Sequence, residues 1–143
     1  MNDRFKFRVW LEYSKLYYGL DSFYYNSLKN KYTFHFEDGH TKTIKEKDCV
    51  IEQCTGFKDS NGKLIYEGDI VKETSFDEDS CTGIGFVETG VVCFGGGEYP
   101  CSFTLKNERF YRGYALLGYG VNRLELEVIG NIHENPELVE ESK

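Results

Sequence analysis

Residues 55–72 constrain the fold more than any other part of this sequence. This segment contains three glycines and two clusters of turn-forming residues, at 58–62 and 67–69. Glycine tolerates backbone conformations with positive φ, and Asp, Asn and Ser favour tight turns. A short apolar run follows each cluster, at 64–66 and 70–71. The segment therefore predicts short strands entered through sharp turns and excludes a long helix.

A hairpin is predicted in the first third of the chain. Residues 32–36 and 41–44 are β-forming runs, and Asp38-Gly39 lies between them. This dipeptide between two such runs predicts a β-hairpin with a type I′ turn. His35 is expected on the strand face opposite Phe34 and Phe36.

Most of the remaining chain also reads as short strands. In residues 5–10, Phe5, Phe7 and Val9 alternate with Lys6, Arg8 and Trp10, which predicts a strand with one apolar face. The Tyr- and Phe-rich residues 11–30 have mixed periodicity and predict a meander of short strands or loops. One helical turn is expected near Pro136. Strand spacing of roughly ten residues favours an all-β barrel or sandwich. Further strands are expected at 50–53, 84–94, 99–105 and 124–132.

The net charge of −7 is unevenly distributed. Residues 1–47 carry nine Lys/Arg and six Asp/Glu, whereas residues 48–143 carry eight and eighteen. Overall acidity opposes non-specific binding to phosphate backbones, so nucleic acid is an unlikely partner. No apolar run reaches the ~18 residues of a membrane span, and the first ten residues do not resemble a signal peptide. We therefore expect a cytoplasmic protein with no membrane partner.

Cysteine and aromatic content bear on compartment and assembly. The cysteines are Cys49, Cys54, Cys81, Cys93 and Cys101. An odd number of cysteines without close pairs predicts free, packed thiols in a reducing compartment. The aromatic fraction of 16% exceeds what one small core easily buries, which predicts self-association.

Two apparent metal sites fail on spacing. Residues 59–62 have the composition of a calcium loop, but an EF-hand would need a ligand at Phe57 and its closing Glu at Gly68. A tight turn is the better interpretation. Separations of five, nine and five residues along one potential zinc set match no compact zinc framework. That set is His35, His40, Cys49 and Cys54.

Other chemical sites are also poorly supported. The glycine runs at 83–85 and 95–97 lack the Gly-Lys-Ser/Thr ending of a phosphate loop, and the sequence has no Gly-x-Ser-x-Gly elbow. Asp69 is expected to bind turn amides, and the neighbouring Glu67 to face solvent. We therefore predict no catalytic residue, no cofactor-binding residue and no metal ligand. No cofactor is expected.

Three segments together resemble the YopX family of phage and prophage proteins. They are residues 6–10 (KFRVW), 55–71 (TGFKDSNGKLIYEGDIV) and 127–138 (EVIGNIHENPEL). Their order and the chain length also match the family. The residues that carry the motif are Trp10, Gly56, Asp59, Gly62, Tyr66, Gly68, Asp69, Gly130, Asn131, Asn135 and Pro136.

The resemblance implies a gene of phage or prophage origin, a cytoplasmic protein of the bacterial host, self-association and a β-rich fold with a small barrel in its second half. Gly-Asp-Ile-Val at 68–71 also opens many barrels of the Src-homology-3 kind. We therefore expect a mainly β chain: a β-rich segment at 1–47, a barrel-like domain at 48–136 and an acidic tail at 137–143.

Three functional hypotheses stay open. The leading one is an accessory protein that acts as an interaction or structural module, as a homo-oligomer or with a host or phage protein. The second is a nucleic-acid-associated protein that binds through the basic strand at residues 4–10 or mimics DNA through its acidic part. The third is an enzyme with an unrecognised site, which would need a deep pocket with convergent polar groups.

Overall fold

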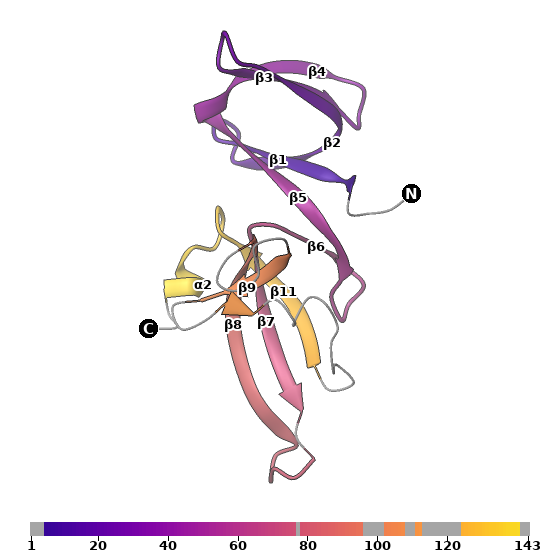
Figure 1. Ribbon diagram of the computed structural model, residues 1–143, viewed down its shortest axis with the longest axis vertical. Helices are drawn as coiled ribbons and strands as arrows, with labels where there is room; N and C mark the ends of the chain where they lie inside the picture. The colour runs from indigo at the N-terminus through magenta and orange to yellow at the C-terminus, as the bar shows by residue number, and fades with distance from the viewer. Residues whose placement is uncertain (1–4, 77, 96–101, 108–110, 113–123, 141–143) are drawn as a thin grey trace. The chain divides into compact units, whose positions relative to one another are not determined.

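The computed structural model describes residues 5–76, 78–95, 102–107, 111–112 and 124–140, and these form mainly antiparallel β structure (Figure 1). The expected mainly β fold is thus confirmed. The chain divides into two compact units, Met1–Cys54 and Thr55–Lys143, which we call the first and second units.

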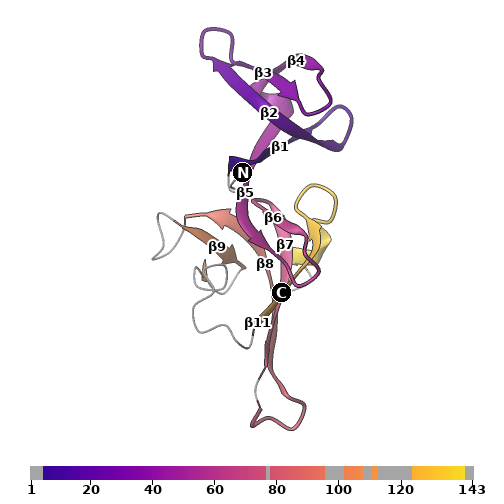
Figure 2. The same cartoon turned by 90° about the vertical axis from the view of Figure 1, so that its right-hand side faces the viewer.

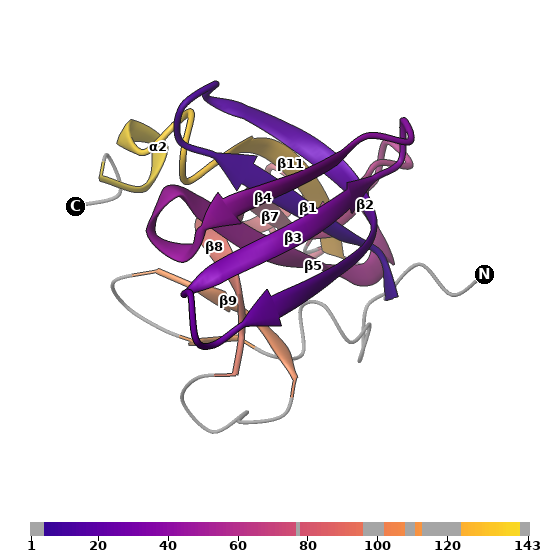
Figure 3. The same ribbon diagram turned by 90° about the horizontal axis from the view of Figure 1, so that it is seen from above.

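The first unit is a meander of four strands to which a fifth returns. Its strands are β1 (Phe7–Leu11), β2 (Leu16–Asn26), β3 (Lys31–Phe36), β4 (Thr41–Lys45) and β5 (Cys49–Lys58), which continues into the second unit. A short 3-10 helix, η2 (Glu46–Asp48), precedes β5. The sheet order is β4-β3-β2-β1-β5-β6, so β5 pairs with β1 (Figure 3) and the short strand β6 (Leu64–Tyr66) of the second unit follows β5.

The core of the first unit follows from strand alternation. Side chains two residues apart point to the same sheet face, so β1 turns Val9 and Leu11 inward. Phe34 and Phe36 of β3 meet them from across the sheet, together with Ile44 of β4. Partly buried aromatic side chains complete this core, namely Phe7, Tyr18, Phe23 and Tyr32.

The predicted meander at residues 11–30 is wrong, because residues 16–26 form the single strand β2. A register shift between Leu20 and Ser22 interrupts its pairing with β3. Tyr18 and Leu20 face the core before the shift and Phe23 after it. A bulge of this kind switches the inward positions from even to odd numbers, which explains the mixed periodicity of the sequence.

The hairpin predicted at Asp38-Gly39 is present, but the type I′ turn is wrong. That turn needs positive φ at both central residues, and among the described non-glycine residues only Lys15 and Asn30 have positive φ. The loop has three residues. The Phe36 amide donates to the His40 carbonyl at 2.9 Å, and Gly39, with φ of 93°, closes the turn.

The second unit also contains a five-stranded antiparallel sheet (Figure 2). Its order is β10-β9-β8-β7-β11, so the last strand, β11, returns to pair with the first strand of the sheet, β7. Ile65 of the short strand β6 packs into the core with Val71, Val92 and Leu105. The elements are β6 (Leu64–Tyr66), β7 (Asp69–Phe76), β8 (Ile84–Phe94), β9 (Phe103–Lys106), β10 (Tyr111–Arg112), β11 (Leu124–Asn131) and the helical turn α2 (Glu137–Glu140).

Both units share one strand order. In each, four strands form a meander, and the fifth returns to the free side of the first. This is the order of small barrels of the Src-homology-3 kind, a fold-level analogy. The sequence predicted such a barrel for the second half; the first unit has the same order although the two halves show no sequence repeat.

Some predicted boundaries also change. The strand expected at 50–53 extends to Lys58, so Gly56, predicted to lie in a turn, lies within β5 with φ of 84°. Positive φ inside a strand is typical of a β-bulge. Residues 84–94 form one unbroken strand, whereas residues 99–101 and most of 107–120 lie outside the described residues.

Candidate functional site

Asp59 of the sequence motif accepts three hydrogen bonds from backbone amides. Its Oδ1 accepts hydrogen bonds from the amides of Asn61 and Lys63, both at 2.9 Å, and its Oδ2 accepts one from the amide of Val128 at 3.0 Å. The side chain is buried. Both carboxylate oxygens are thus directed at backbone amides, which is how an aspartate stabilises a tight turn.

The turn that Asp59 organises also covers the last strand of the second unit. The amide of Ser60 donates to the carbonyl of Leu126 at 2.8 Å, next to the bond between Val128 and Asp59. Leu126 and Val128 belong to β11, whose other side pairs with β7. The turn therefore satisfies the outer edge of β11, an edge that would otherwise be open to other strands.

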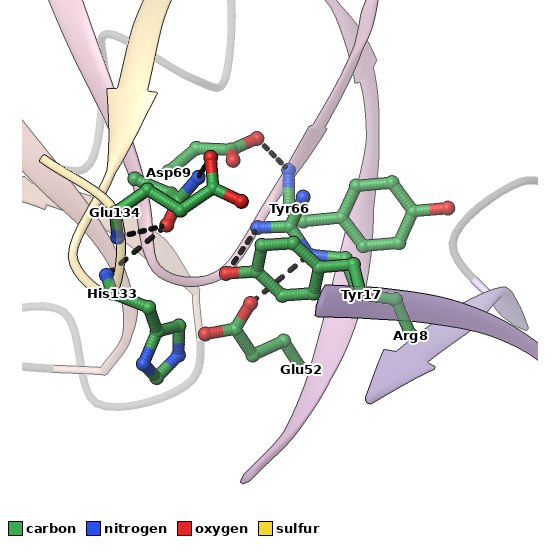
Figure 4. A network of polar contacts seen from close by, with 8 residues as sticks. Arg8, Tyr17, Glu52, Tyr66, Asp69, His133 and Glu134 are labelled. Carbon is green, nitrogen blue, oxygen red and sulfur yellow. Dashed lines mark hydrogen bonds and ion pairs between the residues drawn. The ribbon is translucent and has the colours of Figure 1, made fainter. Parts of the chain in front are cut away.

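A second turn, at residues 66–69, contacts the C-terminal end of β11. Asp69 Oδ2 accepts a hydrogen bond from the Tyr66 amide at 2.8 Å (Figure 4). Gly68, with φ of 82°, lies between them; its amide donates to the Val92 carbonyl, and its carbonyl accepts from the Ile132 amide, both at 2.9 Å. Positive φ is readily available only to glycine, so Gly68 joins β8 to the end of β11.

The third motif segment forms a compact turn after β11. Asn131 Oδ1 accepts from the amides of His133 and Glu134 at 3.1 and 2.9 Å (Figure 4). Asn135 packs against Gly130 so closely that a Cβ at that position would lie 2.6 Å from Asn135 Oδ1. Gly130 therefore permits the approach of Asn135, and α2 begins directly after Pro136.

The two motif segments 55–71 and 127–138 thus lie side by side in the structure. Asp59 and Gly68 accept hydrogen bonds from the amides of Val128 and Ile132, and Ser60 donates to Leu126, directly before the second segment. These bonds between residues 59–68 and 126–132 close the second unit by holding its last strand. We call this arrangement the closure motif.

In the first unit, the motif residue Trp10 belongs to a cluster on the β1 face opposite the core. Arg8 Nε lies 3.0 Å from Glu52 Oε1, and the guanidinium carbon lies 3.9 Å from the centre of the Tyr17 ring (Figure 4). The Tyr17 ring also packs edge-to-face on the Trp10 ring, with the ring centres 5.1 Å apart. Trp10 is only 2% exposed and Glu52 only 3%.

This cluster alters the interpretation of the basic N-terminal strand. The sequence placed Arg4, Lys6 and Arg8 on a face available for nucleic acid. Arg8 is instead bound by Glu52 and Tyr17, and Arg4 lies outside the described residues. A guanidinium held by a buried carboxylate is a structural group, because releasing it would break a buried ion pair.

The potential zinc set is not brought together by the fold. His35 Nδ1 lies 3.0 Å from Thr41 Oγ1, and His40 Nδ1 lies 3.1 Å from Asp38 Oδ2. Cys49 and Cys54 are both buried. Among the described residues, no group of three or more His, Cys, Asp or Glu side chains has the geometry to hold a metal ion.

Burial controls the chemistry of the described cysteines. Burial, together with the charges of Asp48 and Glu46, raises the pKa of Cys49 to about 11. Burial also raises the pKa of Cys93, with Lys106 lowering it and Glu67 raising it by smaller amounts. Both thiols therefore stay protonated at neutral pH, and a thiol is a far weaker nucleophile than a thiolate.

Thiol labelling should therefore be selective. Among the described cysteines, native protein treated with N-ethylmaleimide at pH 7.5 is expected to react first at Cys81, which is exposed, and much more slowly at Cys49 and Cys54, which are buried. Peptide mapping of time points measures each rate, and the denatured protein, in which all cysteines should react alike, is the control. Equal rates at Cys49 and Cys81 in the native protein would contradict this account.

The β7–β8 hairpin carries exposed apolar side chains. Phe76, Ile84 and Val87 are 38%, 43% and 53% exposed. Phe76 pairs directly with Ile84, and Val87 pairs with Thr74, two residues before Phe76. All three side chains thus lie on one face near the hairpin end; we call them the hairpin patch.

A groove runs along β4 in the first unit, and the sequence did not predict it. It has a volume of about 650 Å³ and lies between β4 and the residues Glu12, Tyr13 and Asp48. Lys42 Nζ spans it, 2.7 Å from the Tyr13 hydroxyl and 4.6 Å from the centre of its ring. We call it the β4 groove. Only the tertiary fold shows that residues 13 and 42 meet.

These observations define a small two-unit β protein whose sequence motif builds backbone turns. The chain belongs to the YopX family: the family model described as YopX protein matches residues 6–140. The predicted family is therefore confirmed. The matched range includes the closure motif and the cluster around Trp10.

A solved structure also resembles this chain. The chain is similar to protein EF1440 from Enterococcus faecalis, whose crystal structure aligns with a TM-score of 0.57 and 25% sequence identity, covering 94% of this chain and 96% of that chain. No curated protein matches the sequence. Within the described residues, the structure contains no helix with the length and apolar character to cross a membrane.

Proposed function

We propose that this protein is a non-catalytic interaction module of a phage or prophage, which acts in the bacterial cytoplasm and self-associates. The hairpin patch carries the proposal. Three apolar side chains gather on one face of one hairpin, each more than a third exposed. Exposed apolar clusters of this kind mark interaction surfaces in soluble proteins.

A second copy of this chain is the partner that fits the patch best. Phe76 and Ile84 form a cross-strand pair, so the same small surface on two molecules can pack face to face about a two-fold axis. Apolar surface of this kind is self-complementary. The family resemblance, which implies self-association and a phage or prophage gene, supports the same conclusion.

The proposal predicts an oligomer that depends on the hairpin patch. Light scattering of the purified protein is expected to give a mass above that of the monomer, and Ile84→Ser with Val87→Ser should shift it to the monomer, because the double change removes most of the apolar contact. Leu28→Ser is the matched control: among the described residues of the first unit it removes the most exposed apolar side chain, at 95% exposure, and it should leave the mass unchanged.

Either of two results would overturn this proposal. One is a wild-type protein that remains strictly monomeric at the highest soluble concentration. The other is an oligomer of the same mass in the folded double variant. Circular dichroism of each variant shows whether the β structure is retained, so that loss of assembly is not confused with unfolding.

A further inference from the structure

The edge of β4 in the first unit is open. In the described part of the chain, β4 pairs only with β3, and it is the first strand in the sheet order. The hydrogen bond from Phe36 to His40 fixes which residues face β3. Successive residues of an antiparallel strand direct their backbone groups to opposite sides, so Lys42 and Ile44 bond to β3, whereas Thr41 and Thr43 direct their amides and carbonyls outward.

The open edge forms one wall of a space wide enough for another chain segment. The β4 groove measures about 650 Å³. A second hollow of about 370 Å³ lies on the other side of the Tyr13–Lys42 contact, lined by the aromatic rings of Tyr18 and Phe36. An added strand would thus meet backbone hydrogen-bonding groups along β4 and hollows for its side chains, as in β-strand addition.

Lysine side chains surround the same edge. Lys31, Lys42 and Lys45 line the β4 groove, and Lys29 and Lys47 line an adjoining hollow of about 400 Å³ with Lys45. In the linings of all three hollows, the five lysines outnumber the four carboxylates, Glu12, Asp38, Glu46 and Asp48. Although the chain as a whole is acidic, this surface favours a negatively charged ligand.

We propose that β4 binds an extended acidic peptide segment of another protein by strand addition. This inference rests on the proposed function and assigns it a second surface and a partner class. Outward amides of Thr41 and Thr43 donate to the carbonyls of the added strand, and their carbonyls accept from its amides. Acidic side chains of the added strand lie beside Lys31, Lys42 and Lys45.

Two competing occupants fit less well. Nucleic acid phosphates only accept hydrogen bonds, so the outward carbonyls of Thr41 and Thr43 would repel them. Two copies of β4 paired with each other would bring Lys42 and Lys45 against the same lysines of the second copy, and like charges directly opposite on strands are destabilising. Lysines on an edge strand exclude such self-pairing, whereas they favour an acidic strand.

Selection from a random dodecapeptide display library on the immobilised wild-type protein tests the proposal. The enriched peptides are expected to be acidic and rich in β-forming residues. Synthetic versions of them should shift the NMR signals of the Thr41 and Thr43 amides. Binding should weaken by about tenfold or more in Lys31→Glu with Lys45→Glu, because repulsion replaces attraction. Lys58→Glu, the same type of substitution with half the charge change at an exposed lysine that does not line the groove, is the control.

A second variant tests strand addition itself. Thr43→Pro removes an outward amide without removing a bond to β3, and it should abolish binding while NMR shows a folded first unit. Enrichment of peptides without acidic character, unchanged binding to both folded variants, or competition by a single-stranded oligonucleotide with higher affinity would each overturn the proposal. Because assembly through the hairpin patch is measured separately, such a failure leaves the proposed function testable on its own.

Discussion

Replacing Asp59 with alanine is expected to lower the free energy of unfolding of the second unit by about 3 kcal/mol. Three backbone amides, those of Asn61, Lys63 and Val128, lose their charged acceptor in this variant. Burial of the site limits replacement of that acceptor by water. Asp59→Asn should lower the free energy of unfolding by less, because its amide side chain keeps one carbonyl oxygen that accepts hydrogen bonds from backbone amides.

Urea denaturation followed by NMR or circular dichroism measures this loss, and the two units can be monitored apart. Trp10 is the only tryptophan, so its fluorescence reports on the first unit. Asp21→Ala, at an exposed position of β2, is the matched control and should change stability by less than about 0.5 kcal/mol. A loss of the same small size for Asp59→Ala would show that the closure motif is not needed.

The same carboxylate makes a pH-dependent contribution. Burial alone would raise the pKa of Asp59, but the amides of Val128, Lys63 and Asn61 and the charge of Lys63 together lower it below 3.8. A group with a lowered pKa in the folded state contributes stability above its unfolded pKa and loses it as pH falls through the folded pKa. The stability difference between wild type and Asp59→Asn should therefore be full at pH 6–7 and shrink below about pH 4.

The second large effect is expected at Arg8. Arg8→Ala should destabilise the first unit by about 3 kcal/mol, because it removes the cation that contacts the buried carboxylate of Glu52. The Arg8 and Glu52 side chains are 14% and 4% exposed, and their atoms lie 3.0 Å apart. Loss of the guanidinium also removes the contact with the Tyr17 ring, on which Trp10 packs.

A double-mutant cycle separates the ion pair from general packing. Arg8→Met and Glu52→Leu should each lower the free energy of unfolding strongly when made alone. The double variant should lower it by much less than the sum of the two, since neither charge of this ion pair remains. Lys15→Ala is the control. It breaks the exposed pair with Glu12, in which Lys15 is 68% exposed, and should change stability by at most about 0.5 kcal/mol. Additive effects of the two buried substitutions would contradict the assignment.

Local patterns in the sequence predicted local structure well. The turn residues at 59–62 and 67–69 form turns, and Asp38-Gly39 closes a hairpin. The type of that hairpin turn was wrong because the Asp-Gly pair also suits a three-residue loop with glycine in the left-handed position. The register shift in β2 was missed because a bulge mixes two alternation patterns into one without a clear period.

The candidate sites depend on contacts that no local pattern contains. Asp59 and Val128 are 69 positions apart, so the sequence identified both motif segments without showing that they bind each other. The β4 groove likewise arises only when the tertiary fold brings Lys42 to Tyr13. The common strand order of the two units was also hidden, because equivalent strands have different side chains and lengths.

Amide hydrogen exchange at Val128 tests the role of the closure motif most directly. In the wild-type protein this amide, which donates to Asp59, should exchange slowly, and in Asp59→Ala it should exchange at least about tenfold faster. The amide of Val9 in the first unit should keep its rate in both proteins. An unchanged exchange rate at Val128 in the Asp59→Ala variant would contradict the conclusion that these motif residues hold the last strand in place.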